Sequence, residues 1–179
     1  MRFEKVSFDA FCKDCLKYGH IVYRKVKDDN TSYIENLDNL KQIYDEIKLP
    51  KRSTSKSCGY DFFNPFHNCY IYTRPNFIPS GIKVLLDDDK FLMVCPRSSS
   101  GKKRYRMSNT LGIIDCDYYN NPDNEGDIII ALEHTKPGDM YCFKQGEAIA
   151  QGIILPFFTM EDDNAEGDRL GGFGSTDNT

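Results

Sequence analysis

Residues 91–101 are Phe91-Leu92-Met93-Val94-Cys95-Pro96-Arg97-Ser98-Ser99-Ser100-Gly101, an apolar run of strand length followed at once by a polar turn. The same arrangement recurs from about residue 58 to residue 158, where runs rich in Ile, Val, Tyr and Phe alternate with turn sequences. Among those turns are Arg74-Pro75-Asn76, Pro79-Ser80-Gly81, Pro137-Gly138-Asp139 and Gln145-Gly146-Glu147. Short strands at such regular spacing predict an all-β fold, a barrel or a jelly roll.

The segment before residue 49 has a different pattern. Residues 2–6 alternate between polar and apolar, which predicts a short first strand. Apolar side chains then recur at helical spacing over two stretches, Phe8–Leu16 and Ile34–Ile47. The sequence therefore predicts two short helices in an insert, residues 7–48, that follows the first strand.

Residues at the ends of these stretches support the helices. Ser7 is a suitable N-cap for the first, and Gly19 lies just past its end. Ser32 and Glu35 have the spacing of a capping box at the start of the second. We expect one β domain over residues 1–160 and a flexible C-terminal arm over residues 161–179.

Composition narrows the class of protein. The chain has 179 residues, a formal net charge of −4 and 40% hydrophobic residues. An acidic chain lacks the cationic surface that nucleic-acid binding needs, and no apolar run approaches the ~18 residues of a membrane span. Seven scattered cysteines, an odd number, suit a reducing cytoplasm better than a disulfide framework. We therefore expect a cytoplasmic protein that binds neither nucleic acid nor membrane.

Three features within the β region point to chemistry. Arg97 and the serines after it suit a phosphate cradle, although an ordinary polar turn would have the same composition. Residues 109–119 deliver two carboxylates, Asp115 and Asp117, to a strand end, where they would serve as general base, metal ligands or turn caps. Gln151 is the one amide in the apolar run 148–156, and its partner is either a ligand or neighbouring backbone.

The C-terminal residues are glycine-rich around one aromatic ring: Arg169, then Gly171-Gly172-Phe173-Gly174-Ser175-Thr176. Glycine lets backbone N–H groups converge on an anion, and a phenyl ring offers a face to a base. Such a tail suits a mobile clamp for a nucleotide, with disorder as the alternative.

Taken in order, these segments resemble the five motifs of the trimeric dUTPase family, the deoxyuridine triphosphate nucleotidohydrolases. The matching segments are Ser57-Cys58-Gly59-Tyr60-Asp61-Phe62, Pro96-Arg97-Ser98-Ser99, Gly112-Ile113-Ile114-Asp115-Cys116-Asp117-Tyr118, Ala148-Ile149-Ala150-Gln151 and Gly171-Gly172-Phe173-Gly174-Ser175-Thr176. The residues after Tyr118 resemble the subgroup of Gram-positive bacteria and their phages. The resemblance implies a distorted jelly roll of the β-clip type and a homotrimer.

The resemblance also implies an activity and the residues for it. In this family dUTP is hydrolysed to dUMP and pyrophosphate, which limits uracil incorporation into DNA and supplies dUMP. Asp115 would activate the attacking water, and Asp61 would reach Mg²⁺ on the triphosphate through water. Phosphate contacts would come from Arg97, Ser98, Ser99, Gln151, Arg169, Gly174, Ser175 and Thr176. Uracil would be read by Asn109, Gly112 and Ile114, with Tyr118 under the sugar and Phe173 over the base.

Two other functions remain open at this point. One is a dCTP deaminase on a similar fold, for which the catalytic glutamate would fall near Ala131 and Glu133. The other is a non-catalytic dUTP sensor or regulatory module. A protein partner for the 7–48 insert would favour the second of these.

Overall fold

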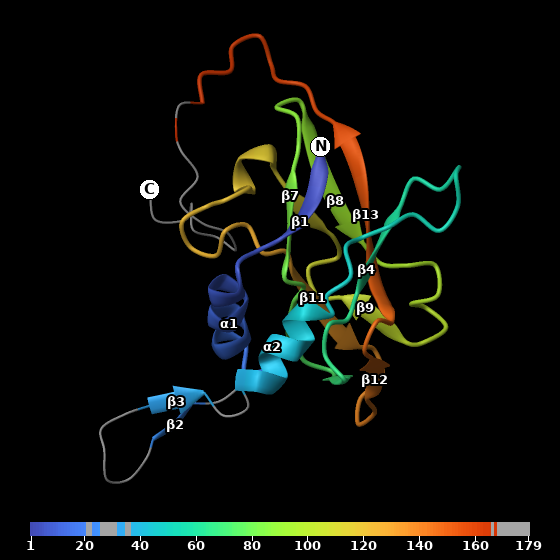
Figure 1. The fold of residues 1–179 in the computed structure, drawn as a ribbon. Helices are drawn as coiled ribbons and strands as arrows, with labels where there is room; N and C mark the ends of the chain where they lie inside the picture. Colours follow the sequence, from blue (N-terminus) through green and yellow to red (C-terminus); the bar gives the residue numbers. More distant parts are fainter. Residues whose placement is uncertain (21–22, 26–31, 35–36, 166, 168–179) are drawn as a thin grey trace.

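The computed structural model describes residues 1–20, 23–25, 32–34, 37–165 and 167 (Figure 1). Its elements are β1 Arg2–Lys5, α1 Phe8–Lys17, β2 Tyr23–Lys25, β3 Ser32–Ile34, α2 Leu37–Asp45, β4 Tyr60–Phe63, β5 Asn68–Ile71, β6 Asn76–Pro79, β7 Ile82–Leu85, β8 Lys90–Cys95, β9 Tyr105–Met107, β10 Gly112–Ile114, the 3₁₀ turn η1 Cys116–Tyr118, β11 Ile129–His134, β12 Tyr141–Lys144 and β13 Ala148–Pro156. The prediction of a β fold with two helices after the first strand is confirmed.

Antiparallel pairing organises the strands into small sheets. The largest sheet has the order β10-β8-β13-β4, and a second has the order β6-β11-β9. The remaining strands pair as β1 with β7, β12 with β5, and β2 with β3. The β13–β4 pair contains a register shift between Ala148 and Ala150, a bulge within the motif segment 148–151. Short strands of this kind, distributed over several sheets, are consistent with the jelly roll that the sequence predicts.

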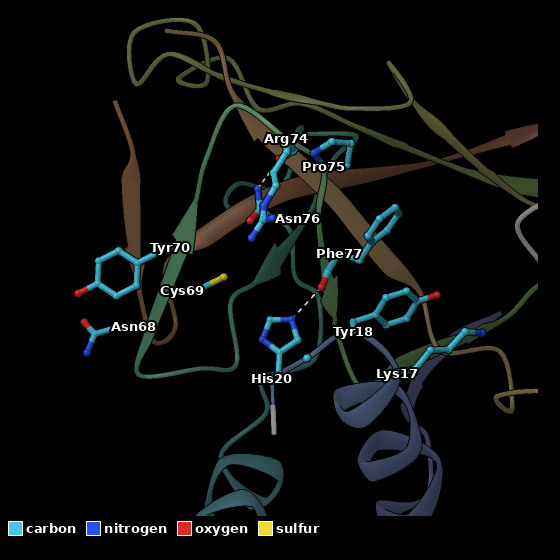
Figure 2. A pocket seen from close by; sticks show the side chains of 11 residues that line it. Lys17, Tyr18, His20, Asn68, Cys69, Tyr70, Arg74, Pro75, Asn76 and Phe77 are labelled. Atoms are coloured by element: carbon cyan, nitrogen blue, oxygen red, sulfur yellow. Dashed lines mark hydrogen bonds between the residues drawn. The ribbon is translucent and has the colours of Figure 1, made fainter. Parts of the chain in front are cut away.

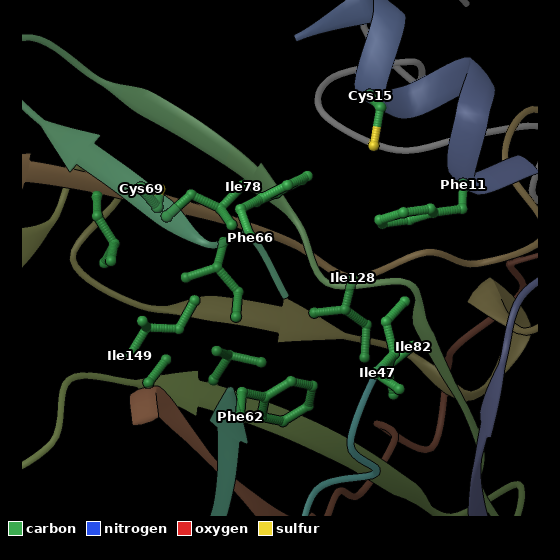
Figure 3. Packing of buried hydrophobic residues seen from close by; sticks show 14 of the residues in the cluster. Phe11, Cys15, Ile47, Phe62, Phe66, Cys69, Ile78, Ile82, Ile128 and Ile149 are labelled. Carbon is green, nitrogen blue, oxygen red and sulfur yellow. The ribbon is translucent and has the colours of Figure 1, made fainter. Parts of the chain in front are cut away.

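The core lies where these sheets and the helices face one another. In β5 and β7 every second residue is buried, as strands with one face toward a core require. Figure 3 shows Phe11 and Cys15 of α1 directed toward the same cluster as Phe66, Ile82 and Ile128. Because Phe11 and Cys15 are completely buried, the apolar face of α1 is a packing surface of this chain.

The predicted ends of α1 are confirmed. The Ser7 hydroxyl accepts a hydrogen bond from the Ala10 N–H at 3.1 Å, and Gly19 has a φ of +75° just past the helix. Helix α2 packs beside α1, with the Tyr44 ring 5.4 Å from Phe8 and 5.9 Å from Phe11. Figure 1 shows the two helices together, with the β2–β3 hairpin beyond them.

The predicted capping box at Ser32 and Glu35 is wrong. Ser32 lies in β3, where it pairs with Lys25 of β2, and α2 begins only at Leu37. The segment Ser32-Tyr33-Ile34 includes an aromatic and a β-branched residue, which fit a strand better than a helix start. Cross-strand pairing therefore outweighs the local capping signal.

Candidate functional site

Strand register brings three of the motif segments side by side. Gln151 of β13 lies opposite Cys95 of β8 on one side and opposite Asp61 of β4 on the other. Residues that lie opposite each other in an antiparallel sheet point to the same face. Asp61, Gln151 and the end of β8 therefore form one cluster, and Arg97 follows two residues after Cys95.

Arg97 and Asp61 form a forked ion pair at the centre of this cluster. The Arg97 Nε lies 2.8 Å from Asp61 Oδ1, and Nη2 lies 3.3 Å from Oδ2. Ser53 also donates to Asp61 Oδ2, at 3.1 Å. Asp61 therefore orients the Arg97 side chain. Because that side chain is still 30% exposed, an anion from solvent can reach it.

The remaining polar groups of the cluster are held by backbone. The Gln151 amide donates to the Pro96 carbonyl at 3.0 Å, which fixes the turn that carries Arg97. Gly59 leaves room for this amide, because a Cβ there would lie 2.4 Å from Gln151 Oε1. Ser98 is exposed, whereas the Ser99 hydroxyl is buried without a hydrogen bond of normal geometry to any described residue. Two serines and an arginine at a strand end suit a phosphate group.

The third motif segment lies along the other edge of the same sheet. In β10, Gly112 lies opposite Val94 and Ile114 lies opposite Leu92. The preceding turn is tight, with Thr110 at a φ of +66° and the Leu111 N–H bonded to the Asn109 carbonyl at 2.7 Å. Asn109 is exposed at this turn, next to the half-buried Gly112. The backbone of this segment is thus presented near the surface.

Asp115 comes directly after β10 and occupies the N-cap position of η1. Its carboxylate is partly exposed, as a group that exchanges protons with water needs to be. Tyr118, at the end of η1, is 6% exposed and donates its hydroxyl to Asn124 Oδ1 and to the Asp127 carbonyl, each at 3.3 Å. Burial raises the pKa of Tyr118 to about 12, so its phenol stays neutral.

The two parts of the site lie at opposite ends of β8. Ile114 lies opposite Leu92, so Asp115 lies near the start of β8, whereas Arg97 follows its last residue. In an extended chain the five residue steps from Leu92 to Arg97 span roughly 17 Å. In Figure 1 the two segments lie on opposite sides of the β-structure. One chain therefore does not bring Asp115 to Arg97.

The predicted arm residues Arg169, Phe173, Gly174, Ser175 and Thr176 lie outside the described residues. Within the described part of the chain, no group of three or more His, Cys, Asp or Glu side chains is arranged to hold a metal ion, and no helix is long and apolar enough to cross a membrane. All seven cysteines are described, and all are free thiols.

Two cavities lie away from the predicted residues. One of about 700 Å³, shown in Figure 2, opens between the end of α1 and strands β5 and β6, and is lined by Lys17, Tyr18, His20, Tyr70 and Arg74 among others. A second, of about 320 Å³, lies between the end of α2 and the turns near Asn64 and Gly146. Neither contains a residue from the motif segments.

The two positions at which a deaminase would carry its catalytic glutamate have structural roles in β11. Ala131 is buried at 3% exposure, and Glu133 forms an ion pair with Arg106 across the β11–β9 pair at 2.6 Å. A structural ion pair on a sheet accounts for Glu133.

Sequence reasoning missed three polar residues near the site. Ser53 supports Asp61, and Asn124 and Asp14 lie behind Tyr118. Ser53 lies outside the motif segments, so nothing in the sequence indicated its contact with Asp61. Asp14 had a visible signal, since it lies on the helix face between Phe11 and Cys15 that is otherwise apolar.

The chain is similar to known proteins over most of its length. It is 37% identical over 133 residues to the deoxyuridine 5′-triphosphate nucleotidohydrolase of Lactococcus lactis, a match that covers 73% of this chain and 88% of the relative. It is 30% identical over 141 residues to the enzyme of the same name from Escherichia phage T5, covering 72% and 90% of the two chains. No family model matches the chain.

Solved structures agree with these relatives. The dUTPase from Streptococcus mutans superposes with a TM-score of 0.59 at 33% identity, covering 63% of this chain and 88% of that one. A mutant dUTPase of phage phi11 of S. aureus, which coordinates a structural Mg(II) ion, superposes with a TM-score of 0.55 at 18% identity, covering 67% and 90%. At that identity the second likeness shows the fold alone.

Proposed function

The chain belongs to the dUTPase family, the deoxyuridine 5′-triphosphate nucleotidohydrolases, and from this premise we propose how its own residues carry out the reaction. The protein is an enzyme, a dUTP diphosphatase, that hydrolyses dUTP to dUMP and pyrophosphate. The names of its relatives support this activity and neither deamination of dCTP nor a purely sensory role. The observation that carries the assignment is the 37% identity to the Lactococcus lactis enzyme over 73% of the chain.

Asp115 is the proposed general base. Its partly exposed carboxylate at the end of β10 would orient a water molecule and accept one of its protons. The water oxygen would then form a bond to the α-phosphorus as the bond to the bridging oxygen breaks, and pyrophosphate would leave in line. Positioning of the water supplies much of the rate in such a step.

The cluster at the end of β8 would bind the triphosphate. Of the predicted phosphate contacts at this strand end, Arg97 and the exposed Ser98 present side-chain donors to solvent, and Ser99 and Gln151 lie beside them. The ion pair with Asp61 holds the Arg97 fork in place before substrate arrives. A preoriented cation and hydroxyls would stabilise the charge that develops in the transition state without moving at that moment.

Asp61 would bind Mg²⁺ through water. Mg²⁺ usually keeps several waters and is held by one or two carboxylates together with substrate phosphates, so a cluster of protein ligands is not needed. The residues present fit this mode, because Asp61 Oδ1 has one hydrogen-bond partner and keeps a lone pair. When bound, the ion would neutralise part of the triphosphate charge.

Specificity for deoxyuridine would come from the third motif. The exposed backbone from Asn109 to Ile114 would pair with the uracil edge, and cytosine would leave a buried group without a partner. The buried Tyr118 ring would pack under the sugar and leave no space for a 2′-hydroxyl.

The arm, residues 161–179, would complete the site. In this proposal Phe173 covers the uracil, and Arg169, Gly174, Ser175 and Thr176 contact the phosphates. Residues 1–160 form the β domain on which the arm closes, which excludes water from the reacting groups.

A homotrimer would supply what one chain lacks. Asp115 and Arg97 lie at opposite ends of β8, so a complete site needs Asp115 from one copy and Arg97 from another. The free state of all seven thiols supports a reducing, cytoplasmic location. A protein partner for the 7–48 insert remains a prediction, and the buried apolar faces of α1 and α2 do not require one.

Turnover of dUTP by purified protein tests the proposal. We expect pyrophosphate release that requires Mg²⁺ and falls by about 10³-fold or more in Asp115→Asn, because the amide cannot accept the proton. Asp117→Asn, an exposed carboxylate two residues away, is the matched control and should retain most of the activity. Equal rates for wild type and Asp115→Asn would overturn the assigned base.

A further inference from the structure

The inserted helix α1 is attached to the loop that follows the third motif, residues 119–127. The Ser7 N–H and hydroxyl both bond to the Glu125 carboxylate, at 2.9 and 2.6 Å. Further along the helix, Lys13 and Lys17 form ion pairs with Asp123 at 3.1 and 3.4 Å. The insert therefore contacts this loop along the length of its first helix.

Between these surface contacts lies a buried one. Asp14 of α1 is completely buried, and its Oδ2 accepts a hydrogen bond from Asn124 Nδ2 at 3.1 Å. Its Oδ1 is buried without a hydrogen-bond partner among the residues that the structure describes. A carboxyl group in such a place costs folding free energy, because one of its buried oxygens has no hydrogen bond to offset the loss of water.

Asn124 connects Asp14 to Tyr118. Its Oδ1 accepts from the Tyr118 hydroxyl at 3.3 Å, from Asn121 Nδ2 at 3.0 Å and from the Gly126 N–H at 3.1 Å. Its Nδ2 donates to Asp14 and to the Asp127 carbonyl, each at 3.1 Å. All donors around Asn124 thus face its oxygen and both acceptors face its nitrogen, so the amide has one stable orientation.

Asp14 is the member of this network that comes from the insert. Without its acceptor, Asn124 would keep the Asp127 carbonyl but lose one of its two partners on the nitrogen side, and the amide would be held less firmly. The Tyr118 hydroxyl would keep the Asp127 carbonyl, but its side-chain acceptor, Asn124 Oδ1, would be less firmly placed, and so would the ring. Both effects originate on the far side of Tyr118 from the proposed substrate.

We propose that Asp14 is a positioning residue that acts through Asn124 to hold the Tyr118 ring, which gives the inserted helix α1 a part in excluding ribonucleotides. This inference rests on the proposed place of Tyr118 under the sugar. The role is specific: the insert controls the choice between a hydrogen and a hydroxyl at the 2′ position. The phosphate cluster around Arg97 is not involved.

The test compares dUTP with UTP. We expect Asp14→Leu, which removes the acceptor but keeps the branching and the number of side-chain heavy atoms, to lower the ratio of kcat/KM for dUTP to kcat/KM for UTP by about tenfold. Asp14→Asn should keep the wild-type ratio, because its amide oxygen still accepts from Asn124. If Asp14→Leu does not fold, Asp14→Ser provides the measurement, since a hydroxyl on a shorter side chain cannot reach Asn124.

A matched control separates positioning from loss of stability. Ile71→Val removes one methyl group from a fully buried site on β5, outside the network of Asp14, Asn124 and Tyr118, and should lower stability with an unchanged ratio. An unchanged ratio in both Asp14→Leu and Asp14→Ser, in an enzyme that hydrolyses dUTP, would overturn the inference alone. A wild-type protein that leaves dUTP intact would overturn the proposed function and the role of Asp14 together.

Discussion

Gly126 shows how one residue without a side chain sets the shape of the loop of residues 119–127, which follows η1. Its φ is +87°, and a Cβ there would lie 2.6 Å from the Tyr118 carbonyl oxygen. Asn120 and Glu125 in the same loop also have positive φ values, of +58° each. The loop is therefore held in a conformation that side chains tolerate poorly, and the contacts from α1 help to keep it there.

Gly126→Ala should be more damaging than an alanine at another glycine of positive φ. Gly138 has a φ of +75° and open space around its Cβ position, so Gly138→Ala carries only the backbone cost, about 1 kcal/mol. We expect Gly126→Ala to cost at least about 2 kcal/mol more, because its methyl group meets backbone. Urea unfolding of both variants measures the difference. Equal losses in the free energy of unfolding would show that the close approach of residue 126 to the Tyr118 carbonyl does not affect stability.

Among the elements, α1 has the most varied attachments. Its apolar face packs on the core through Phe11 and Cys15, and its polar face carries the ion pairs with Asp123. At its inner side it brings Asp14 close to Asp127, a second completely buried carboxyl group that accepts from the Gly81 N–H at 2.8 Å. Burial, and then the nearby Asp14, raise the pKa of Asp127 well above its ordinary value of 3.8.

This raised pKa has a consequence for stability. The folded chain keeps the Asp127 proton to a higher pH than the unfolded chain does, so the stabilising contribution is complete below about pH 3.8 and is lost as the pH rises through the raised pKa. Relative to Asp127→Asn, the wild-type free energy of unfolding should therefore fall as the pH rises, by at most about 1.4 kcal/mol per pH unit. Denaturant titrations of both proteins between pH 4 and pH 8 check this, and parallel profiles would contradict it.

At the scale of the whole molecule, the sheet β10-β8-β13-β4 separates the two halves of the proposed site. The cluster of Asp61, Arg97 and Gln151 lies at one end of β8, and Asp115 lies at the other. Exposed apolar side chains occur beside the second half, among them Leu111 and Ile113, which are 38% and 50% exposed. These residues are suited to contact another copy of the chain, which would carry the phosphate cluster to Asp115.

Mixing two inactive variants tests this arrangement. Asp115→Asn and Arg97→Gln should each be inactive alone, because each spoils one half of every site. After the two are unfolded together and refolded as mixed oligomers, about a quarter of the sites would combine two intact halves, and about a quarter of wild-type activity should return. Mixtures that stay inactive despite mixed assembly, verified by native mass spectrometry, would show that both halves come from the same chain.

The sequence predicted features that depend on neighbouring residues better than features that depend on residues far apart in the chain. Ser7 and Gly19 mark the ends of α1 correctly because capping and a positive φ are local properties. The motif residues Asp61, Arg97 and Gln151 lie together because each lies in or next to a strand of one sheet, an arrangement that their separate places in the sequence do not indicate. Ser32 misled because its capping spacing competes with the pairing of Ser32 to Lys25, which local sequence does not reveal.

The support behind the site escaped prediction for the same reason. Asn124 and Asp14 are 110 residues apart in sequence, and a contact over such a distance leaves no spacing to read. The separation of Asp115 from Arg97 likewise depends on the antiparallel register of β10 on β8, which only the folded chain shows. The roles of the individual site residues remain predictions.

The packing of the insert also determines how this chain can be shortened. Phe11, Leu40 and Ile43 belong to the same buried cluster as Phe66 and Ile82 of the β-structure. Removing residues 7–48 would strip those β residues of their cover and leave a wide apolar surface in water, which favours self-association over a smaller soluble enzyme. The insert is therefore part of the folded core. A shortened version of this protein would need polar substitutions on the surface that the insert now covers.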